Sequence, residues 1–494
     1  MIVRKFEAYV ENLPNHIDLQ YDDVDIQIFS GSLNLEQPLL TVKGQTTDSI
    51  NAQIAFKTIK IKSLSYWDYV FNECINIQAI KVDEPEITYY HNKKVNNERY
   101  HSVLTNKLNK KINIASFEVS NAEIKIFKIT NDSLIFSAEK LDFQLDSVVF
   151  NSSETKKLPF AFQNLSLSSE NLKYNISEFE NLFVASLNMN NQNTTLEEFE
   201  LKTKYSKAEL SKRIKTERDH FDLSIASVDI QNHNLKFDKT SSAHFEADSI
   251  LINKPDFHIY RDKSITDDLV DKPLYSKMLR ELNFDLTLSN VIINKAEITY
   301  EEKVKTDREP GRLEFSNLEA TIKNISNTYS ESERTSLNIT SNFMKNTPLE
   351  VDWNFDVNDV NDNFVFKADI GMLKAEHLNQ FMKPNLNLKL EGELIRTYFT
   401  IDGTANHSQI DLKTDYDQFD IVILKENGEE KNKFLSGLVN LFIAKDSNDK
   451  TDGFRHSDTK TVERDKTKSI FNFIWKNAQS GLVSAMAGDG KKDN

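Results

Sequence analysis

Few residues of this chain have the types and spacing that catalysis or metal binding requires. The 494-residue sequence contains ten scattered histidines and one cysteine. His244 and His258 fall in one segment, but they are fourteen residues apart, and a surface or half-buried histidine is the commoner case. The sequence also has no glycine-rich phosphate loop and none of the common nucleophile or zinc motifs. It therefore predicts a protein that is not an enzyme, with no catalytic residue, no metal and no cofactor.

Two acidic segments were candidates for chemistry. The run 352–364 suggests calcium, but it lacks the glycine and the final glutamate of the familiar calcium loop, so we expect a solvated turn. Glu301 and Glu302 are adjacent on a predicted strand, where neighbouring side chains point to opposite faces. They are therefore not expected to act as a carboxylate pair.

Charge and cysteine content exclude further classes. The net charge is −15, and lysines and arginines are interspersed with acids throughout. No basic stripe is present, so a nucleic acid partner is not expected. Cys74 cannot form an internal disulfide, and its apolar neighbours predict a small buried hydrophobic residue.

A fifteen-residue pattern recurs through most of the chain and determines how the rest is interpreted. Positions one, three, six, eight, thirteen and fifteen are apolar. Position nine is polar, and position eleven is small or proline. The clear copies are 75–89, 112–126, 245–259 and 286–300. Looser copies are 160–174 and 223–237, and 33–42 matches the second half of the pattern.

The apolar residues alternate within each copy, which predicts strands with one buried and one wetted face. The extra residue between positions three and six, as at Gln78-Ala79, predicts a β-bulge. The step at positions nine to eleven, as at Asp83-Glu84-Pro85, is either a tight turn or a bend. The copies are expected to pair with one another in antiparallel fashion.

Composition agrees with an all-β fold. The chain has 32 Phe and 15 Tyr but only 12 Gly and 9 Pro, which excludes collagen-like and Pro/Gly-rich disordered chains. The copies begin at irregular intervals, unlike the rungs of a tightly wound solenoid. We expect an all-β dominated fold, namely a long curled antiparallel sheet that forms a repeating β-groove, with short helices at the termini and in insertions.

Three segments are expected: an N-terminal amphipathic helix at 1–18, the groove at 19–430, and a helical tail with a polar linker at 431–494. Helical insertions are predicted near 206–219, 273–282 and 373–382, the last with an apolar stripe of Leu373, Leu378, Phe381 and Met382.

The tail contains a predicted short helix at 434–444, a flexible linker at 446–468 and an apolar helix at 469–487. This last helix either caps the open end of the sheet, where strand edges would be unpaired, or contacts a membrane or partner protein. We expect the first.

The inner face of the sheet is predicted from the alternation. A sheet with one apolar face must cover it. Curling leaves an apolar trough that acyl chains could occupy, whereas a packed sandwich or β-helix would fill it with its own side chains. The residues predicted to face this interior, as lipid-groove candidates, are Ile114, Phe117, Ile124, Ile250, Phe257, Val291 and Ile298.

Three segments resemble the AsmA-like envelope proteins of bacteria. Residues 271–303 are similar to the central region of that family, close to its branch with a domain of unknown function. The likeness lies in a Pro-Leu lead-in, a short helix and a strand that ends in Ala-x-Ile-x-Tyr-x-Glu. Residues 366–403 are similar to the family's C-terminal strand block, and 16–42 to its N-terminal module.

The resemblance implies a lipid-transfer protein of the bacterial envelope. It implies phospholipid carried along an apolar β-groove between inner and outer membrane, a contribution to outer-membrane homeostasis, and a possible outer-membrane or periplasmic protein partner. The alternative is a surface or periplasmic β-rich binding or scaffold protein with a filled core.

The resemblance also implies a periplasmic location with an inner-membrane anchor. The longest apolar run, 435–444, is about half the length that spans a bilayer. Family members usually begin with a transmembrane helix just before the stretch equivalent to Arg4-Lys5-Phe6. We expect such an anchor to be missing from this chain.

Overall fold

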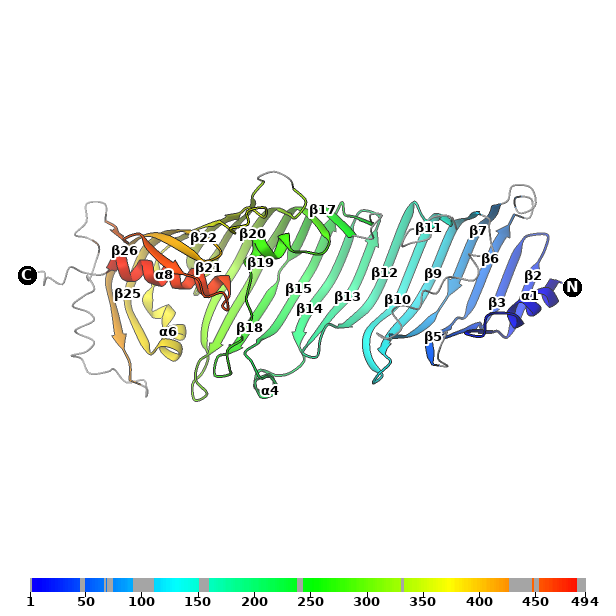
Figure 1. Ribbon diagram of the computed structural model, residues 1–494, viewed down its shortest axis with the longest axis horizontal. Coiled ribbons are helices and arrows are strands. Elements are labelled where there is room, and N and C mark those ends of the chain that lie inside the picture. The colour runs from blue at the N-terminus through cyan, green and yellow to red at the C-terminus, as the bar shows by residue number, and fades with distance from the viewer. Residues whose placement is uncertain are drawn as a thin grey trace, which may run out of the picture. The chain divides into compact units, whose positions relative to one another are not determined.

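The computed structural model describes residues 2–44, 49–65, 68, 74–91, 111–150, 160–237, 243–329, 333–425, 447 and 453–486. Strands dominate the described chain, which confirms the predicted all-β fold, and they form a large mixed sheet with few short helices (Figure 1). The chain divides into two compact units, which are described separately. Unit 1 comprises 1–200 and 228–243, and unit 2 comprises 201–227 and 244–494. The boundaries at residues 18 and 430 stay a prediction.

Unit 1 begins with one short helix and continues with strands. The helix α1 spans Ile2–Glu11, shorter than the predicted 1–18. The strands are β1 (Ile17–Gln20), β2 (Asp23–Gln27), β3 (Ser32–Glu36), β4 (Leu39–Lys43), β5 (Ile50–Ala55), β6 (Thr58–Leu64), β7 (Cys74–Asp83), β8 (Glu86–His91), β9 (Lys111–Lys128), β10 (Ser133–Phe150), β11 (Phe160–Ala161), β12 (Asn164–Asn175), β13 (Glu180–Asn190), β14 (Thr194–Thr203) and β16 (Asn234–Phe237). The last residues of β14 belong to unit 2, and β15 (Asp219–Gln231) also has residues in both units.

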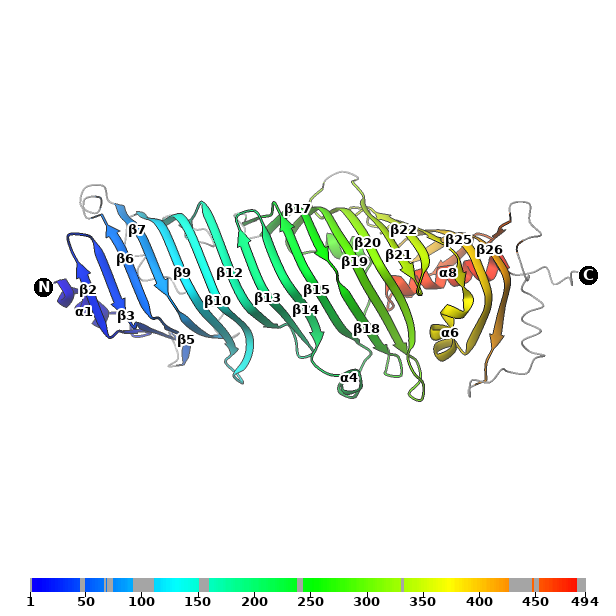
Figure 2. The ribbon, with the colours of Figure 1, turned by 180° about the vertical axis from the view of Figure 1, so that it is seen from behind.

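The first eight strands of unit 1 form four bent strands, each made of two consecutive segments. β1 and β2 pair with β4 and β3, and these pair with β5 and β6. β5 and β6 in turn pair with β8 and β7. Both β7 and β8 lie against the single long strand β9. Figure 2 shows β6, β7, β9 and β10 side by side in this order.

Neighbouring repeat copies pair in parallel and in register, so the predicted antiparallel pairing of the copies is wrong. In unit 1, Ile75 is opposite Ile112 and Ile87 is opposite Ile124, position for position along copies 75–89 and 112–126. In unit 2, copies 245–259 and 286–300 match in the same way. The physical reason is that equal apolar patterns align only when both strands run in the same direction. The strands next to the copies, such as β10, are antiparallel.

The step at positions nine to eleven is a bend, which decides between the two alternatives. Position ten has a positive φ in every clear copy and in two other segments: Gln37 (50°), Glu84 (46°), Asn121 (53°), Asn232 (51°), Lys254 (50°) and Lys295 (53°). The ladder continues through the bend, because the Glu84 amide donates to the Ser120 carbonyl at 2.8 Å and the Glu123 amide to the Pro85 carbonyl at 2.9 Å. Pro85 lies in the interior of the sheet at this point.

A second irregularity occurs where the sequence predicted a bulge. The paired positions omit Gln78 and Ala115, but the register is the same before and after them, so no extra residue is inserted and the predicted bulge is wrong. Their antiparallel neighbours Ser63 and Ser147 have φ values of 54° and 55°. The four neighbouring strands β6, β7, β9 and β10 are therefore irregular along one line, and equal numbers of residues on each strand keep them in register.

Unit 2 combines longer strands with helices. The strands are β17 (Ala243–Asn253), β18 (Asp256–Asp262), β19 (Asp285–Lys303), β20 (Gly311–Ser326), β21 (Thr335–Phe343), β22 (Thr347–Phe355), β23 (Phe364–Ile370), β24 (Leu373–Lys374), β25 (Leu388–Gly403), β26 (His407–Ile423), β27 (Arg455–His456) and β28 (Lys460–Glu463). The helices are α4 (Lys207–Arg213), α5 (Tyr275–Arg280), the 3-10 helix η2 (Ala375–Leu378), α6 (Asn379–Leu386) and α8 (Ile470–Met486).

Most helix predictions for unit 2 are confirmed. The three insertions contain α4, α5, and η2 with α6, and the C-terminal helix is α8. The predicted helix at 434–444 lies outside the described residues. The predicted flexible linker at 446–468 is wrong in part, because β27 and β28 pair with β26. Backbone hydrogen bonding to an available strand outweighs the polar composition of this segment.

The core of unit 2 lies between the sheet and these helices. In Figures 1 and 2, α8 lies on one side of the strands β22 to β26. Ile470, Phe473 and Ala485 of α8 pack into one buried cluster with β22, β23, β25 and β26. A second cluster contains Leu373, Phe381 and Met382, with Leu378 at its margin, which confirms the predicted stripe. We call these two clusters the helix-covered core.

Candidate functional site

The strands of unit 1 place apolar side chains in four rows across the sheet. Each row joins residues that are direct cross-strand neighbours. We call them the apolar rows: Ile26, Leu33, Ile61, Ile80, Phe117, Leu145, Leu165; Val24, Leu35, Ile59, Val82, Val119, Phe143, Leu167, Met189; Leu19, Leu40, Ile54, Ile87, Ile124, Ala138; and Ile17, Val42, Ala52, Tyr89, Ile126, Phe136, Tyr174, Leu182.

The bend keeps the rows before and after it on the same face. Without it, positions eight and thirteen of a copy would point to opposite faces, since they are five residues apart. In unit 2, Ile293 and Ile298 occupy these two positions and pack in one cluster. The left-handed residue at position ten therefore restores the alternation, and the same pattern in unit 1 yields one continuous apolar face.

The opposite face of unit 1 is polar at the same level. One row there consists of Asp25, Asn34, Lys60, Lys81, Glu118, Gln144, Ser166 and Asn190. Lys81 and Glu118 form an ion pair within it, and this hydrogen bond, against the opposing effect of burial, lowers the pKa of Glu118. The sheet of unit 1 is thus amphipathic across its thickness.

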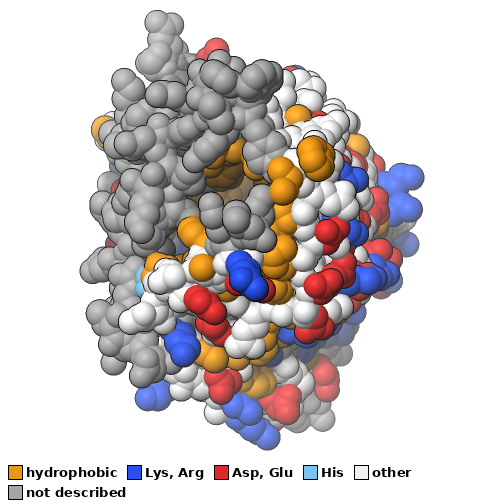
Figure 3. Space-filling model, turned by 90° about the vertical axis from the view of Figure 1, so that its right-hand side faces the viewer, with side chains coloured by type: hydrophobic (Ala, Val, Ile, Leu, Met, Phe, Trp, Pro, Cys, Tyr) orange, Lys and Arg blue, Asp and Glu red, His pale blue; other side chains and the backbone are white. Residues whose placement is uncertain are grey.

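The apolar face of unit 1 is only half-buried among the described residues. Its cluster has Ile114, Leu145 and Val148 as buried members, with Ile80, Phe117 and six other apolar residues partly exposed around them. A hollow of about 450 Å³ lies beside it. Ile77, Ile114 and Val148 line it together with Ser63, Gln78, Ala115 and Ser147. Figure 3, which looks onto the N-terminal end, shows hydrophobic side chains in a line beside a hollow.

The predicted interior residues of unit 1 lie on this apolar face. Ile114 and Phe117 belong to the same cluster. Ile124 is opposite Ile87 on one side and Ala138 on the other. Whether lipid contacts them stays a prediction.

The predicted interior residues of unit 2 are also neighbours. Ile250 is opposite Val291, and Phe257 is opposite both Ile298 and Leu223. Tyr300 is two residues after Ile298, so it is on the same face, and it packs against the helix-covered core. The predicted interior face of unit 2 therefore continues into a region that helices cover.

At the ends of β18 and β19 this face becomes charged. Arg261 follows Phe257 and Ile259 in the alternation and forms two hydrogen bonds of 2.6 Å to Asp219. Burial opposes the charge of the guanidinium, but the bonds to Asp219 outweigh it and raise the pKa of Arg261. Lys263 pairs with Glu302 at 2.8 Å, and Tyr300 donates to Glu302 at 2.7 Å.

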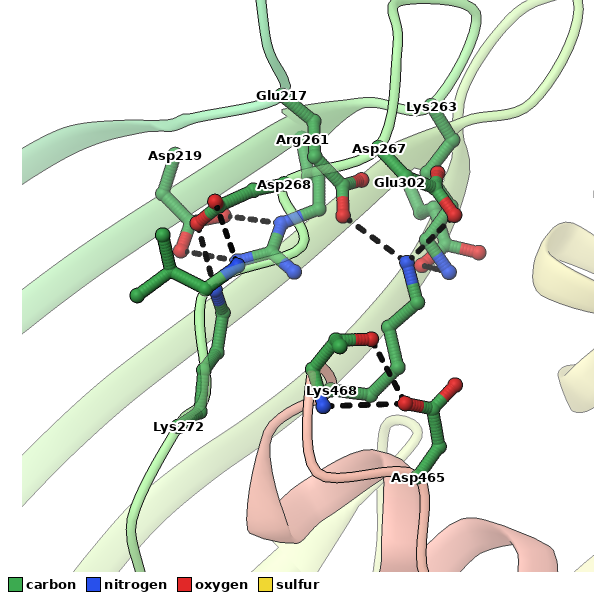
Figure 4. Close-up of polar contacts among 12 residues, drawn as sticks. Glu217, Asp219, Arg261, Lys263, Asp267, Asp268, Lys272, Glu302, Asp465 and Lys468 are labelled. Atoms are coloured by element: carbon green, nitrogen blue, oxygen red, sulfur yellow. Dashed lines mark hydrogen bonds and ion pairs between the residues drawn. The ribbon is translucent and has the colours of Figure 1, made fainter.

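Lys468 connects this charged region to the start of α8. Its ammonium group lies 3.1 Å from Glu217 and 2.9 Å from Asp267 (Figure 4). Glu217 is buried, and burial disfavours the ammonium charge, yet the two carboxylates raise the pKa of Lys468. We call Glu217, Asp219, Arg261, Lys263, Asp267, Glu302 and Lys468 the ion-pair cluster. Its described cations are all paired, so it serves to hold segments together rather than to bind an anion.

The residues considered for chemistry are dispersed. The His244 ring nitrogen pairs with Asp285 at 2.7 Å and that of His258 with Asp256 at 3.2 Å, at opposite ends of the copy. Asp362 of the acidic run accepts from Arg280 at 2.8 Å and Ser276 at 2.9 Å. In the part of the chain that the structure describes, no group of three or more His, Cys, Asp or Glu could hold a metal ion.

Two smaller predictions have different outcomes. Glu301 pairs with Lys207 and Glu302 with Lys263, so the adjacent glutamates have separate partners. Cys74 is half-buried rather than buried, and its sulfur lies 3.1 Å from the Asn113 amide nitrogen. The prediction of a buried Cys74 is wrong because the thiol lies beside two polar side chains, Asn113 on the neighbouring strand and Asn76 on its own strand.

Comparison with protein-family models and with curated proteins finds no match to this chain. Within the described ranges, no helix is both long and apolar enough to cross a membrane.

Sequence reasoning missed the ion-pair cluster and the covering of the sheet by α8. The cluster joins residues up to 251 positions apart, such as Glu217 and Lys468, so no local pattern marks it. The apolar stripe of 469–487 was a signal for α8, although it suggested a cap at the strand edges rather than a helix on the face.

Proposed function

We propose that this protein binds lipid along the apolar face of its sheet and conveys it without catalysing a reaction. The observation that supports the proposal is the set of apolar rows in unit 1, which cross up to eight strands without a polar interruption. The described residues leave these rows half-buried. An apolar surface of this extent favours an apolar ligand.

Acyl chains suit such a surface because they need no specific partner. Each CH₂ group removed from water contributes roughly 0.8 kcal/mol, whichever row it contacts. A ligand held in this way can shift from one strand to the next without breaking a directional bond. The resemblance to AsmA-like proteins supports phospholipid as the ligand, and an inner-membrane-associated, periplasmic role in outer-membrane homeostasis. These finer points rest on the resemblance alone.

The helix-covered core favours a second candidate function for unit 2. There the apolar face is filled by protein side chains, as in a scaffold or binding protein with a packed interior. Under this alternative, the half-buried face of unit 1 would contact another protein instead of lipid.

The test is native mass spectrometry of the full chain purified from membranes, with and without Ile124→Asp. The variant should lose most of the bound phospholipid, since an unpaired charge on an apolar wall is strongly unfavourable. Ile298→Asp makes the same test in unit 2. The matched control is Gln144→Asp, which places the same charge on the polar face of unit 1. Equal phospholipid in the wild type and in folded Ile124→Asp would contradict the proposal.

A further inference from the structure

The strand formed by β1 and β2 has one unpaired side. β1 pairs with β4 and β2 with β3, and neither has a second pairing partner among the described strands. The helix α1 contacts this strand through Phe6 and Tyr21, whose ring centroids are 5.8 Å apart, and does not pair with its backbone. The outer side therefore presents main-chain donors and acceptors of two strand segments.

All four apolar rows extend to this outermost strand. Ile17, Leu19, Val24 and Ile26 are the outermost members of the four rows. A further strand at this edge would find four apolar positions ready to continue. Figure 3 shows the line of hydrophobic side chains at this end of unit 1.

The other face of the same strand is acidic. Asp18, Asp23 and Asp25 alternate with the apolar residues, and Asp22 lies between the two segments. Within the described chain, Asp18 and Asp25 accept hydrogen bonds from Gln20 and Gln27, and none of the four carboxylates forms an ion pair. Four unneutralised carboxylates along one edge would oppose pairing with a second copy of the same strand and favour a basic one.

We propose that this edge is a docking site for a strand of another protein, one that alternates aliphatic with basic residues. The partner strand adds to the sheet by main-chain hydrogen bonds, continues the apolar rows with its aliphatic side chains and places Lys or Arg beside the aspartates. The proposal does not depend on lipid binding, because strand addition needs only the edge and its charge.

The test measures binding of fluorescent nine-residue peptides to the full chain by anisotropy. A peptide of alternating valine and lysine should bind, whereas a valine–glutamate peptide and a lysine–valine peptide with its residues in two blocks should not. The double substitution Asp23→Lys and Asp25→Lys should lower the affinity for the valine–lysine peptide about tenfold, because each exposed ion pair that is lost contributes a factor of about three. The same variant should gain binding of the valine–glutamate peptide.

Three outcomes would overturn the proposal. One is equal affinity of the alternating valine–lysine peptide and of the peptide with its lysines and valines in two separate blocks, which means that charge alone attracts them. Another is unchanged binding to the charge-reversed variant with an unaltered circular dichroism spectrum. The third is absence of peptide binding together with self-association of the variant in sedimentation, which would mean that the aspartates only protect the edge.

Discussion

The apolar faces of the two units are built from the same strand pattern but are covered differently. In the described part of unit 2, one cluster contains fifteen buried residues, and α8 supplies three of them, Ile470, Phe473 and Ala485. The corresponding cluster of unit 1 contains three, surrounded by partly exposed apolar side chains. The same alternation can therefore produce either a packed core or a receptive surface, and the difference depends on whether a helix lies on the face.

The helix α8 packs closely against β26. An ideal Cβ at Gly481 would lie 3.0 Å from Leu412 side-chain atoms and 3.1 Å from Ile410. Asn477 is fully buried, accepts a hydrogen bond from Ser408 at 2.8 Å and donates to the Phe473 carbonyl at 2.9 Å. Such contacts leave no room for a ligand between α8 and β26.

Removal of α8 should have the largest effect, because it converts the covered face into an uncovered one. A chain that ends at Lys468 loses Ile470, Phe473 and Ala485 from the buried cluster. We expect a lower melting temperature or aggregation, and additional bound phospholipid per molecule where the shortened chain stays folded. A stable truncated chain that only loses membrane or partner association would show that α8 is a docking element.

Matched phenylalanine truncations should separate the two faces. Phe473→Ala removes a buried ring and should cost about 3–5 kcal/mol. Phe117→Ala removes a half-buried ring, and we expect about 1–2 kcal/mol. Hydrogen exchange read separately for peptides of each unit measures both losses. Equal losses would mean that the face of unit 1 is as well covered as that of unit 2.

The bend should respond to backbone chemistry in the same way in both units. Lys295 has φ of 53°, where a β-branched residue is strained, so Lys295→Val should destabilise unit 2 by about 1–2 kcal/mol. Lys295→Gly is the control and should be neutral or stabilising. If Lys295→Gly lowered the melting temperature and Lys295→Val did not, position ten would not require a left-handed backbone conformation.

The smallest expected effect is on the pH dependence of the stability of unit 1. Thr58 donates a 2.7 Å hydrogen bond to Asp83, and this bond lowers the pKa of Asp83 below its usual 3.8. A lowered folded pKa means that the stabilisation is present above the unfolded pKa and is lost as the pH falls through the folded value. Thr58→Val should therefore destabilise unit 1 by about 1 kcal/mol or less near pH 6, discounted for partial exposure.

The control for this prediction is the pH dependence itself. Denaturation of the wild type and Thr58→Val should give stabilities that converge as the pH falls below 3.8. A constant difference between pH 6 and pH 2.5 would show that the substitution acts through packing and not through the Asp83 charge.

The sequence predicted the strands well because their signal is local. Alternation within fifteen residues identified both faces, and the residues at positions nine to eleven identified an interruption. The choice between bend and turn depended on the φ of one residue, such as Glu84, and neither glycine nor asparagine marks that position in every copy. The pairing direction was wrong because the prediction used only the alternation, which is the same for parallel and antiparallel neighbours. The unequal spacing of the apolar positions, which matches between copies only in the parallel direction, was not used.

The covering of unit 2 could not be predicted for a different reason. It depends on contacts between distant segments, such as Lys468 with Glu217 and Leu412 with Gly481. A stripe on a helix specifies that a face will be buried, but not which part of a sheet buries it. The polar composition of 453–468 also concealed two short strands, since edge strands are often polar.

The in-register pairing of copies has an evolutionary consequence. Copies 75–89 and 112–126 are adjacent and align position by position, so duplication of one copy with its antiparallel neighbour would insert two strands without shifting any row. Each added strand lengthens the sheet by about 4.8 Å, so one such event adds roughly 10 Å. A protein of this kind can change its span in fixed increments by unequal recombination, while each apolar row continues through the inserted strands.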